Sequence, residues 1–250
     1  MTSSKKVTPS QLEPLKKVED AACHMLLGFY QGVLSTQLAS GYPLGSVVPY
    51  CLDEQGSPLF LLSDLAQHTK NIKANPKVSL TLYHQGGGDI QQQPRLCVYG
   101  QVKRSTLADN HVGRYYRHFP NAHYYCNELD FNFYQLEVVK GYYVGGFGKV
   151  CWLDAEVFQS PSKLFSEPEE FALLIKMNES YRHLITKLLI SKLIITMPEM
   201  EHMHVMLAGI DSLGFTVRRL DELYRINFPT SASVPGDAQQ LFTTMISQYC

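Results

Sequence analysis

The sequence predicts an α+β fold, in which an antiparallel sheet precedes a smaller module of helices and short strands. Short apolar segments bounded by glycine, proline and aspartate recur between Gly32 and Trp152, a pattern typical of antiparallel strands. The stretch Gln159–Pro168 is rich in serine and proline and therefore predicts a linker. After it, segments with helical periodicity alternate with three short strand-like runs.

The N-terminal part begins with a predicted helix and continues with strands and short helices. Apolar residues recur at every third or fourth position over Gln11–Gln31, which predicts a helix, and Gly32–Thr36 predicts the first strand. Pro43–Cys51 and Pro58–Leu62 flank the turn residues Asp53–Gly56 and predict a hairpin. The further predicted elements are the helix Leu65–Ala74, the strands Val78–Tyr83 and Arg95–Arg104, the helix Ser105–Phe119, and the strands Phe131–Val139 and Gly141–Trp152 joined by a tight turn.

The C-terminal part predicts a separate module. We expect one domain over residues 1–158, a linker over residues 159–168 and a second domain over residues 169–250. The predicted elements of the module are the helices Glu169–Lys176 and Glu179–Ser191, the strands His202–Ala208, Phe215–Arg219 and Leu223–Phe228, and the helix Gly236–Ser247.

Composition excludes several classes of protein. The formal net charge of −1 argues against general nucleic-acid binding, which needs a basic surface. The longest apolar run, Leu184–Thr196, contains Lys187 and Lys192 and is too short for a membrane span. The N-terminus lacks an apolar signal core, so we expect a cytoplasmic protein. The cysteines show no C-x-x-C spacing, which favours reduced, buried thiols over a zinc site.

Polar side chains gather near strand ends and at one helix start, where a small barrel can hold a flat anionic ligand. An unpaired helix N-terminus favours an anion, and a lysine adds a positive charge. The alternative is a solvated helix face that binds nothing. The candidates are Ser46, Ser63, His68, Thr69 and Lys70.

Five segments in a fixed order resemble the pyridoxamine-phosphate-oxidase-like, FMN-binding split barrels, and within them the heme-utilization branch. These segments are GSVVPY (Gly45–Tyr50), LLSDLAQHTKNI (Leu61–Ile72), NPKVSL (Asn75–Leu80), LDFNFYQLE (Leu129–Glu137) and GGFGK (Gly145–Lys149). Leu207–Val217 and Ile226–Pro229 resemble the C-terminal α/β module of that branch. The resemblance covers most of the chain from Gly32 to Gln248.

The resemblance implies an antiparallel split β-barrel of six or seven strands, followed by the small α+β module. A single split barrel has an open side, and relatives close it by pairing two subunits. We therefore expect a homodimer with ligand slots at the subunit interface. The apolar and aromatic character of Phe131–Val139 and Gly141–Trp152 agrees with burial on both faces.

The resemblance also assigns roles to individual residues. In the flavin enzymes, groups matching Ser46, Ser63 and His68–Lys70 contact the flavin ring or its phosphate, and the arginine that matches Arg95 precedes a glutamine that reaches the flavin. Glutamine follows that arginine in the flavin pattern, whereas leucine follows Arg95. In some heme-degrading relatives an aspartate matching Asp130 orients the histidine that ligates iron, although Asp130 could equally cap the turn before the strand.

The axial iron ligand is the least defined part of the predicted site. A heme ligand is a neutral imidazole facing a flat apolar cavity. In heme-binding relatives of this length the ligand lies close to the C-terminus, but no histidine follows His204. The module opening M-N-x-D-H is altered to MNESY at Met177–Tyr181. The candidates are His204, His202 and His183; for the first two, a polar sheet face is the alternative.

Three functions follow from these features. The first is a heme-binding protein of the heme-utilization type, with oxygen-dependent heme degradation driven by an external electron donor of unknown identity. The second is an FMN-dependent oxidoreductase of the pyridoxamine-phosphate-oxidase type. The third is a non-enzymatic dimeric protein that has lost the ligand. Hemin and FMN titrations separate the three.

Overall fold

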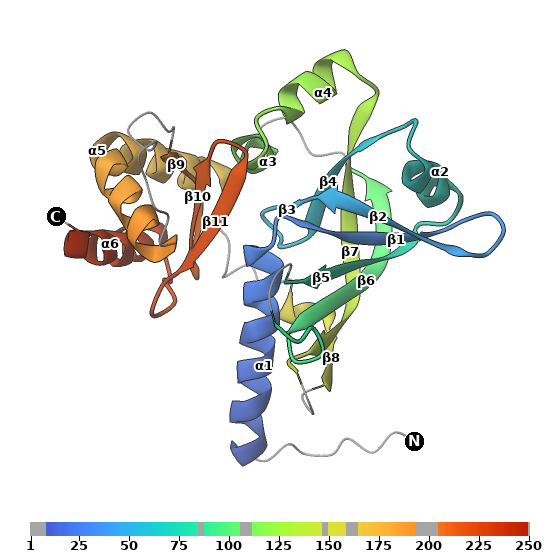
Figure 1. The fold of residues 1–250 in the computed structure, drawn as a ribbon, viewed down its shortest axis with the longest axis horizontal. Coiled ribbons are helices and arrows are strands. Elements are labelled where there is room, and N and C mark those ends of the chain that lie inside the picture. Colours follow the sequence, from blue (N-terminus) through green and yellow to red (C-terminus); the bar gives the residue numbers. More distant parts are fainter. Residues whose placement is uncertain are drawn as a thin grey trace.

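The computed structural model describes residues 9–84, 88–105, 112–146, 150–158, 165–193 and 205–249. A curled antiparallel sheet of eight strands and a separate sheet of three strands form two bodies that lie side by side (Figure 1). The predicted α+β fold is confirmed. The structure has one strand more than the upper number that we expected for the barrel.

The large sheet has the strand order β2-β1-β5-β6-β7-β4-β3, and β8 pairs with β7. Neighbouring strands are antiparallel throughout. Because β2 and β3 stand at the two ends of this order, the half-barrel has open edges. The strands are β1 (Gln31–Gln37), β2 (Pro43–Pro49), β3 (Cys51–Leu52), β4 (Pro58–Ser63), β5 (Lys77–Tyr83), β6 (Arg95–Arg104), β7 (Phe131–Val144) and β8 (Val150–Asp154).

The inner face of the large sheet holds the core of the barrel, because alternate residues of each strand point to it. Leu34 and Leu80 are paired on neighbouring strands and are fully buried. The helix α1 (Pro9–Gly28) contributes Ala22 and Leu26 to the same apolar cluster. The amphipathic helix predicted at this end of the chain therefore serves to fill the concave side of the sheet.

The outer face of the large sheet carries a row of side chains that crosses six strands. At its two ends Val47 is 67% exposed and Trp152 is 60% exposed. The Trp152 ring packs against Tyr142, with ring centroids 4.6 Å apart. The paired residues of the row are Val47, Val33, Thr81, Cys97, Tyr142 and Trp152.

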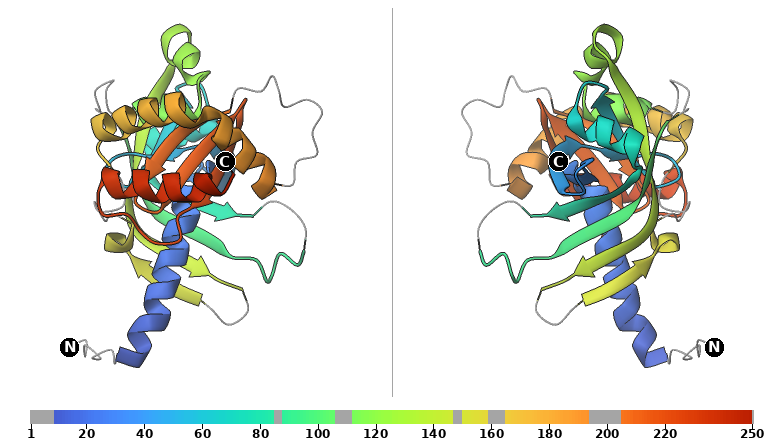
Figure 2. Two further views of the ribbon diagram at one scale, coloured as in Figure 1. Left: turned by 90° about the vertical axis from the view of Figure 1, so that its left-hand side faces the viewer. Right: turned by 90° about the vertical axis from the view of Figure 1, so that its right-hand side faces the viewer.

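The C-terminal module is a three-stranded sheet with the order β11-β10-β9. Its helices α5 and α6 cover the sheet face that points away from the barrel (Figures 1 and 2). Phe215 and Phe242 meet at the centre of this layer, with ring centroids 5.0 Å apart. The elements are α5 (Glu167–Leu193), β9 (Val205–Asp211), β10 (Gly214–Arg219), β11 (Glu222–Asn227) and α6 (Pro235–Ile246).

Three short helices surround the barrel: α2 (Gln67–Ala74), α3 (Gly113–His118) and α4 (Ala122–Glu128). The predicted helix Ser105–Phe119 appears as α3, and residues 106–111 lie outside the described part of the chain. The sequence did not predict α4. Single-turn 3₁₀ helices cover Ala155–Val157 (η2) and Ser247–Tyr249 (η4).

The turn predicted between two strands at Val139–Gly141 is wrong. β7 runs without interruption through these residues, and Val98 of β6 pairs with Gly141. Glycine is required there for another reason. A Cβ on Gly141 would lie 2.5 Å from the ring of Phe158, which packs over this part of the strand. The glycine therefore admits an aromatic ring and does not mark a chain reversal.

Two other predicted elements differ from the structure. The segment Pro43–Cys51 divides between two pairings: β2 pairs with β1, and only the short β3 forms a hairpin with β4. The two helices predicted after the linker are a single helix, because α5 has no break between Lys176 and Glu179. This helix begins at Glu167, inside the predicted linker, and residues 159–164 lie outside the described part. The division of the chain into domains at these positions stays a prediction.

A buried ionic network joins the barrel side to the C-terminal module. Arg114 of α3 donates through Nε to Oε2 of Glu170 at 2.9 Å, and Arg117 donates through Nη2 to the same oxygen at 2.6 Å. The other oxygen of Glu170 accepts the amide of Ile210 on β9 at 2.9 Å. Glu170 is fully buried, so its charge depends entirely on these partners. In the part of the chain that the structure describes, no helix is both long and apolar enough to cross a membrane.

Candidate ligand-binding site

A cavity of about 520 Å³ lies between the barrel and the segment that carries α3 and α4, and we call it the slot cavity. Its volume falls within the range of about 300–1,000 Å³ that is usual for small-molecule sites. Two histidines, His68 and His118, are part of its lining. Most of its walls are apolar, and they include Val47, Leu61, Leu62, Phe119, Ala122 and Phe131.

His68 is the accessible imidazole of the slot cavity. It lies in the first turn of α2 and is half-buried. Burial lowers the pKa of this imidazole below its ordinary value of 6.5, so the ring is mostly neutral at neutral pH. No described residue makes a hydrogen bond to its side chain. A neutral, unpartnered imidazole at the edge of an apolar cavity has the properties of a metal ligand.

His118 is the buried imidazole of the same cavity. Its Nδ1 lies 2.7 Å from the carbonyl oxygen of Arg114. Because a carbonyl only accepts, Nδ1 carries the proton and Nε2 keeps the lone pair. Burial, together with the charges of Arg114 and Arg117, lowers the pKa of His118 to about 3. The ring packs at 5.4 Å from Tyr30, and a Cβ on Gly209 would lie 3.4 Å from Nε2. His118 therefore forms a neutral part of the wall and is less accessible than His68.

The N-terminus of α2 opens beside the slot cavity. Ser63 and Ala66 line the cavity, and Ala66 occupies the N-cap position, where its methyl group cannot accept a hydrogen bond from the helix. The predicted cluster at this helix is therefore only partly assembled. Thr69 is fully buried and its hydroxyl has no partner in the described part, whereas Lys70 is exposed; neither lines the cavity.

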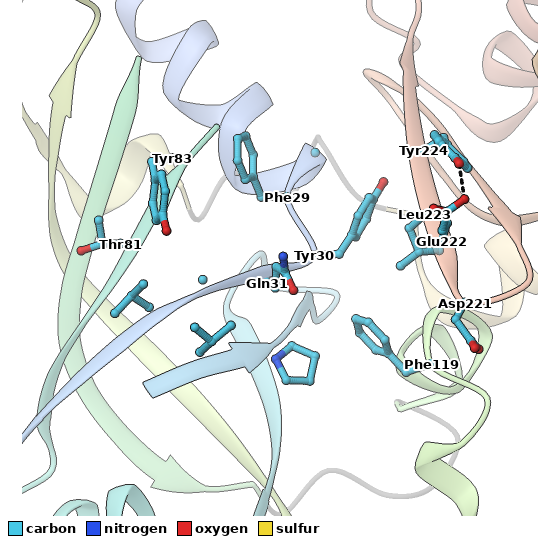
Figure 3. A pocket seen from close by; sticks show the side chains of 15 residues that line it. Phe29, Tyr30, Gln31, Thr81, Tyr83, Phe119, Asp221, Glu222, Leu223 and Tyr224 are labelled. Carbon is cyan, nitrogen blue, oxygen red and sulfur yellow. Dashed lines mark hydrogen bonds between the residues drawn. The ribbon is translucent and has the colours of Figure 1, made fainter. Parts of the chain in front are cut away.

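A second cavity of about 630 Å³ adjoins the first, and we call it the interdomain cavity. Figure 3 shows Thr81 and Tyr83 of β5 on one side of it and Leu223 and Tyr224 of β11 on the other. The hydroxyl of Tyr224 donates to the carboxylate of its neighbour Glu222. The two cavities share the residues Val47, Pro49, Phe119 and Asp221.

The structure does not bring Arg95 to the slot cavity. The register pairs Ser63 with Phe131 at the start of β7, whereas Arg95 pairs with Val144 at the end of the same strand. The two predicted cofactor contacts are thus at opposite ends of a 14-residue strand. Ser46 lies on the edge strand β2, paired with Leu34, and lines neither cavity. The flavin-type contacts expected from Ser46 and Arg95 are therefore not formed within one chain.

Asp130 lies beside the slot cavity without lining it. Its carbonyl accepts the amide of Asp64 at 2.8 Å, and the next residue, Phe131, is part of the cavity wall. The carboxylate is exposed and contacts no described hydrogen-bond partner. It contacts no histidine among the described residues, so its role in orienting an iron-ligating histidine stays a prediction.

Of the three predicted iron ligands, only His183 is among the residues that the structure describes. His183 is exposed on α5 in the C-terminal module and lines neither cavity. His202 and His204 lie outside the described residues. Their roles as ligands stay predictions, and the structure offers His68 as a ligand that the sequence assigned to anion binding.

The helix α3 places Tyr115 and His118 in the lining of the slot cavity. Its arginines pair internally with Glu167 and Glu170, so they are not available to a ligand. The sequence did contain a signal for this pairing, namely two arginines in α3 and acidic residues at the start of α5. Only the tertiary structure shows that these two segments lie in contact.

The chemistry of the slot cavity fits a heme in part. Apolar walls suit the ring, and a neutral imidazole suits the iron. The propionate groups of a heme need positive charge or solvent, and no lysine or arginine is among the described residues that line this cavity. The lining of the cavity therefore suits the heme ring and its iron, whereas the propionate groups need contacts with residues or solvent outside this lining.

Comparison with known proteins places the chain in a family. The model of the family "CREG, beta-barrel" matches residues 29–160, which include the eight-stranded sheet and the helices α2, α3 and α4. The chain belongs to the CREG β-barrel family. The split-barrel resemblance noted in the sequence is thereby confirmed. This CREG β-barrel chain continues beyond the matched region into the C-terminal module.

Individual relatives extend the comparison. The chain is 28% identical to the non-canonical heme oxygenase HOZ, chloroplastic, of Arabidopsis thaliana, over 95% of this chain and 74% of that protein. The structure of Atu2129 from Agrobacterium tumefaciens, a protein of unknown function, is similar with a TM-score of 0.70 and 17% identity, over 98% of this chain and 100% of that one. A heme-binding protein from Mycobacterium smegmatis is similar with a TM-score of 0.54 and 20% identity, over 97% of this chain and 100% of that one. Both structures support the fold of the barrel and the module together.

Proposed function

We propose that this chain binds heme in the slot cavity and takes part in oxygen-dependent heme degradation. The observation that carries the proposal is the half-buried, unpartnered His68 imidazole at the edge of an apolar cavity of about 520 Å³. The similarity to HOZ, a non-canonical heme oxygenase, supports the same ligand and the same reaction class.

Different residues of the slot cavity have different roles in the proposed heme binding. His68 would hold the iron through a ring nitrogen, because burial favours the neutral imidazole. Phe119 and Phe131 would contribute apolar surface that excludes water from the ring. His118 holds its proton on Nδ1 and contributes a rigid polar wall without a charge. When bound, heme supplies the iron at which oxygen chemistry takes place, with electrons from an external donor.

A hemin titration tests the proposal. Wild-type chain should show a saturable increase of the heme absorption band, and His68→Ala should weaken binding at least about tenfold and shift the absorption maximum. Free imidazole should restore the band in the variant, because it replaces the missing ligand.

The matched control is His183→Ala, which removes an exposed histidine that lines neither cavity. It should leave both affinity and spectrum unchanged. If His183→Ala abolished the band while His68→Ala did not, the ligand would lie on α5 and our assignment would be wrong.

FMN is the alternative ligand, and one observation favours it. The N-terminus of α2 lacks a side-chain cap beside Ser63, which suits a phosphate group. If the purified chain showed a flavin absorption spectrum and released the flavin on heating, FMN would replace heme as the assigned ligand. If neither hemin nor FMN bound saturably at micromolar concentration, the chain would be a non-enzymatic binding protein.

Two copies of the chain pair through the outer row of the large sheet. Its ends, Val47 and Trp152, expose large apolar side chains, and a second copy that covers the row would remove both from water. Sedimentation should give twice the mass of 28.3 kDa, and Trp152→Glu should return the mass of one chain because it places a charge in the interface. A wild-type monomer at micromolar concentration would contradict this pairing.

A further inference from the structure

A third cavity, of about 470 Å³, adjoins the slot cavity on the side of the C-terminal module. We call it the arginine cavity because Arg182 and Arg218 are part of its lining. Pro120, Asn121 and Asp221 line both this cavity and the slot cavity. The two cavities are therefore neighbours that share these three residues as a wall.

Arg218 of β10 is a partly buried guanidinium without a carboxylate partner among the described residues. Its Nη1 donates to the carbonyl of Leu220 at 3.4 Å, and its Nη2 lies 2.8 Å from the sulfur of Met206. Its buried Nε has no hydrogen-bond partner in the described part of the chain. A buried N–H group that is left unpaired is costly, so the hydrogen bonding of this guanidinium is incomplete within the described residues.

The other buried arginines of the same region show the contrast. Arg225 binds both carboxylate oxygens of Asp211 at 2.6 and 2.7 Å, and Arg114 binds Glu170. Burial lowers the pKa of the Arg218 guanidinium, an effect that the Asp221 carboxylate partly opposes. The group still carries its charge at neutral pH, because the ordinary pKa of a guanidinium lies far above neutrality.

Arg182 supplies the second positive charge of the arginine cavity. It lies on α5, is exposed, and makes no ion pair with a described residue. Two arginines and the one carboxylate of Asp221 leave a net charge of +1 on the ionisable groups of the lining. The planar fork of a guanidinium matches the two oxygens of a carboxylate or a phosphate.

We propose that Arg182 and Arg218 form an anion subsite that binds the carboxylate groups of a ligand whose apolar body lies in the slot cavity. The proposal rests on the proposed function, since heme combines a flat apolar ring with acid side chains. The anion subsite supplies the positive charges that the lining of the slot cavity lacks. Arg182 and Arg218 line the neighbouring cavity, which shares Pro120 and Asn121 with the slot cavity.

The test compares hemin with hemin dimethyl ester, in which both acid groups are blocked. Arg218→Gln and Arg182→Gln should each weaken hemin binding about tenfold and leave the affinity for the ester unchanged. Arg182→Gln keeps the test valid if Arg218→Gln folds poorly, because its side chain is exposed on a helix. The matched control is Arg219→Gln, which removes the same charge from a residue paired with Glu222 at 3.5 Å. It should leave both affinities unchanged.

The outcomes separate the subsite from the proposed function. If wild type and both variants bound hemin equally, the anion subsite would be overturned while heme binding stood. If wild type bound no hemin, the proposed function would fail and the subsite with it. If inorganic phosphate raised the Tm of wild type but not of Arg218→Gln, while hemin affinity was insensitive to the substitution, the arginines would bind free phosphate and the assignment to ligand carboxylates would be overturned.

Discussion

His118 keeps a neutral imidazole inside the junction between the two bodies, and its protonation should couple stability to pH. Burial, with the charges of Arg114 and Arg117, lowers its pKa from 6.5 to about 3. The unfolded chain therefore binds the proton more tightly than the folded chain. The neutral His118 ring contributes its full share to the free energy of unfolding above pH 6.5, and this contribution is lost as the pH falls from 6.5 toward 3.

The expected loss is about 1.4 kcal/mol for each pH unit within that window. Urea unfolding gives the free energy of unfolding of wild type and of His118→Gln at neutral pH and at about pH 5. The contribution of His118 is the difference between the stability that each protein loses over this pH range. The variant should lose less stability on acidification. Equal dependences in the two proteins would mean that His118 is not a buried neutral group.

The residues that sequence could place were those close together in the chain. Ser63 and His68 follow a strand end and open a helix within six positions, so the local pattern was enough to bring them to one cavity. Sheet register, which local sequence does not reveal, pairs Arg95 with Val144 at the far end of β7 from Ser63, and its role as a cofactor contact stays a prediction. His118 gained its importance only from burial by another part of the chain.

At the scale of the element, Gly141 fixes how β7 and η2 pack. A Cβ added there would lie 2.5 Å from the ring of Phe158, which is itself buried. Gly141→Ala should therefore destabilise the protein by about 1–3 kcal/mol, the usual range for overpacking. Gly236→Ala is the control, because its Cβ would meet no atom within 4 Å. Urea unfolding should show no loss for the control, and an unchanged Gly141→Ala would contradict the packing of Phe158 on the strand.

The strands and helices were predicted well where their own residues determine them. β6 was predicted with its exact bounds, because alternating apolar residues mark the strand along its length. The errors concern glycine and helix continuity. Gly141 was interpreted as a turn residue, although the ring of Phe158 is what requires a glycine there. The helix α5 was divided at Met177 and Asn178. Met177 packs in the core of the C-terminal module, and the Asn178 side chain makes hydrogen bonds to the backbone of Leu207 on β9.

For the whole molecule, the network around Glu170 holds the barrel side against the C-terminal module. Glu170→Gln leaves the buried Arg114 charge without a carboxylate partner, while Arg117 keeps Glu167, and should cost about 3–5 kcal/mol. The control Glu179→Gln makes the same change at an exposed position of the same helix and should cost little. Denaturant unfolding compares the two. Similar stabilities for both variants would show that the network does not join the two bodies.

The three cavities meet along this junction, and Asp221 lines all of them. The position of the bound iron tests the account most directly, and anomalous scattering from a crystal of the hemin complex locates it. The iron is expected at bonding distance from a ring nitrogen of His68, with the acid groups of the heme toward Arg218. Iron in the interdomain cavity, between Tyr83 and Tyr224, would contradict the account.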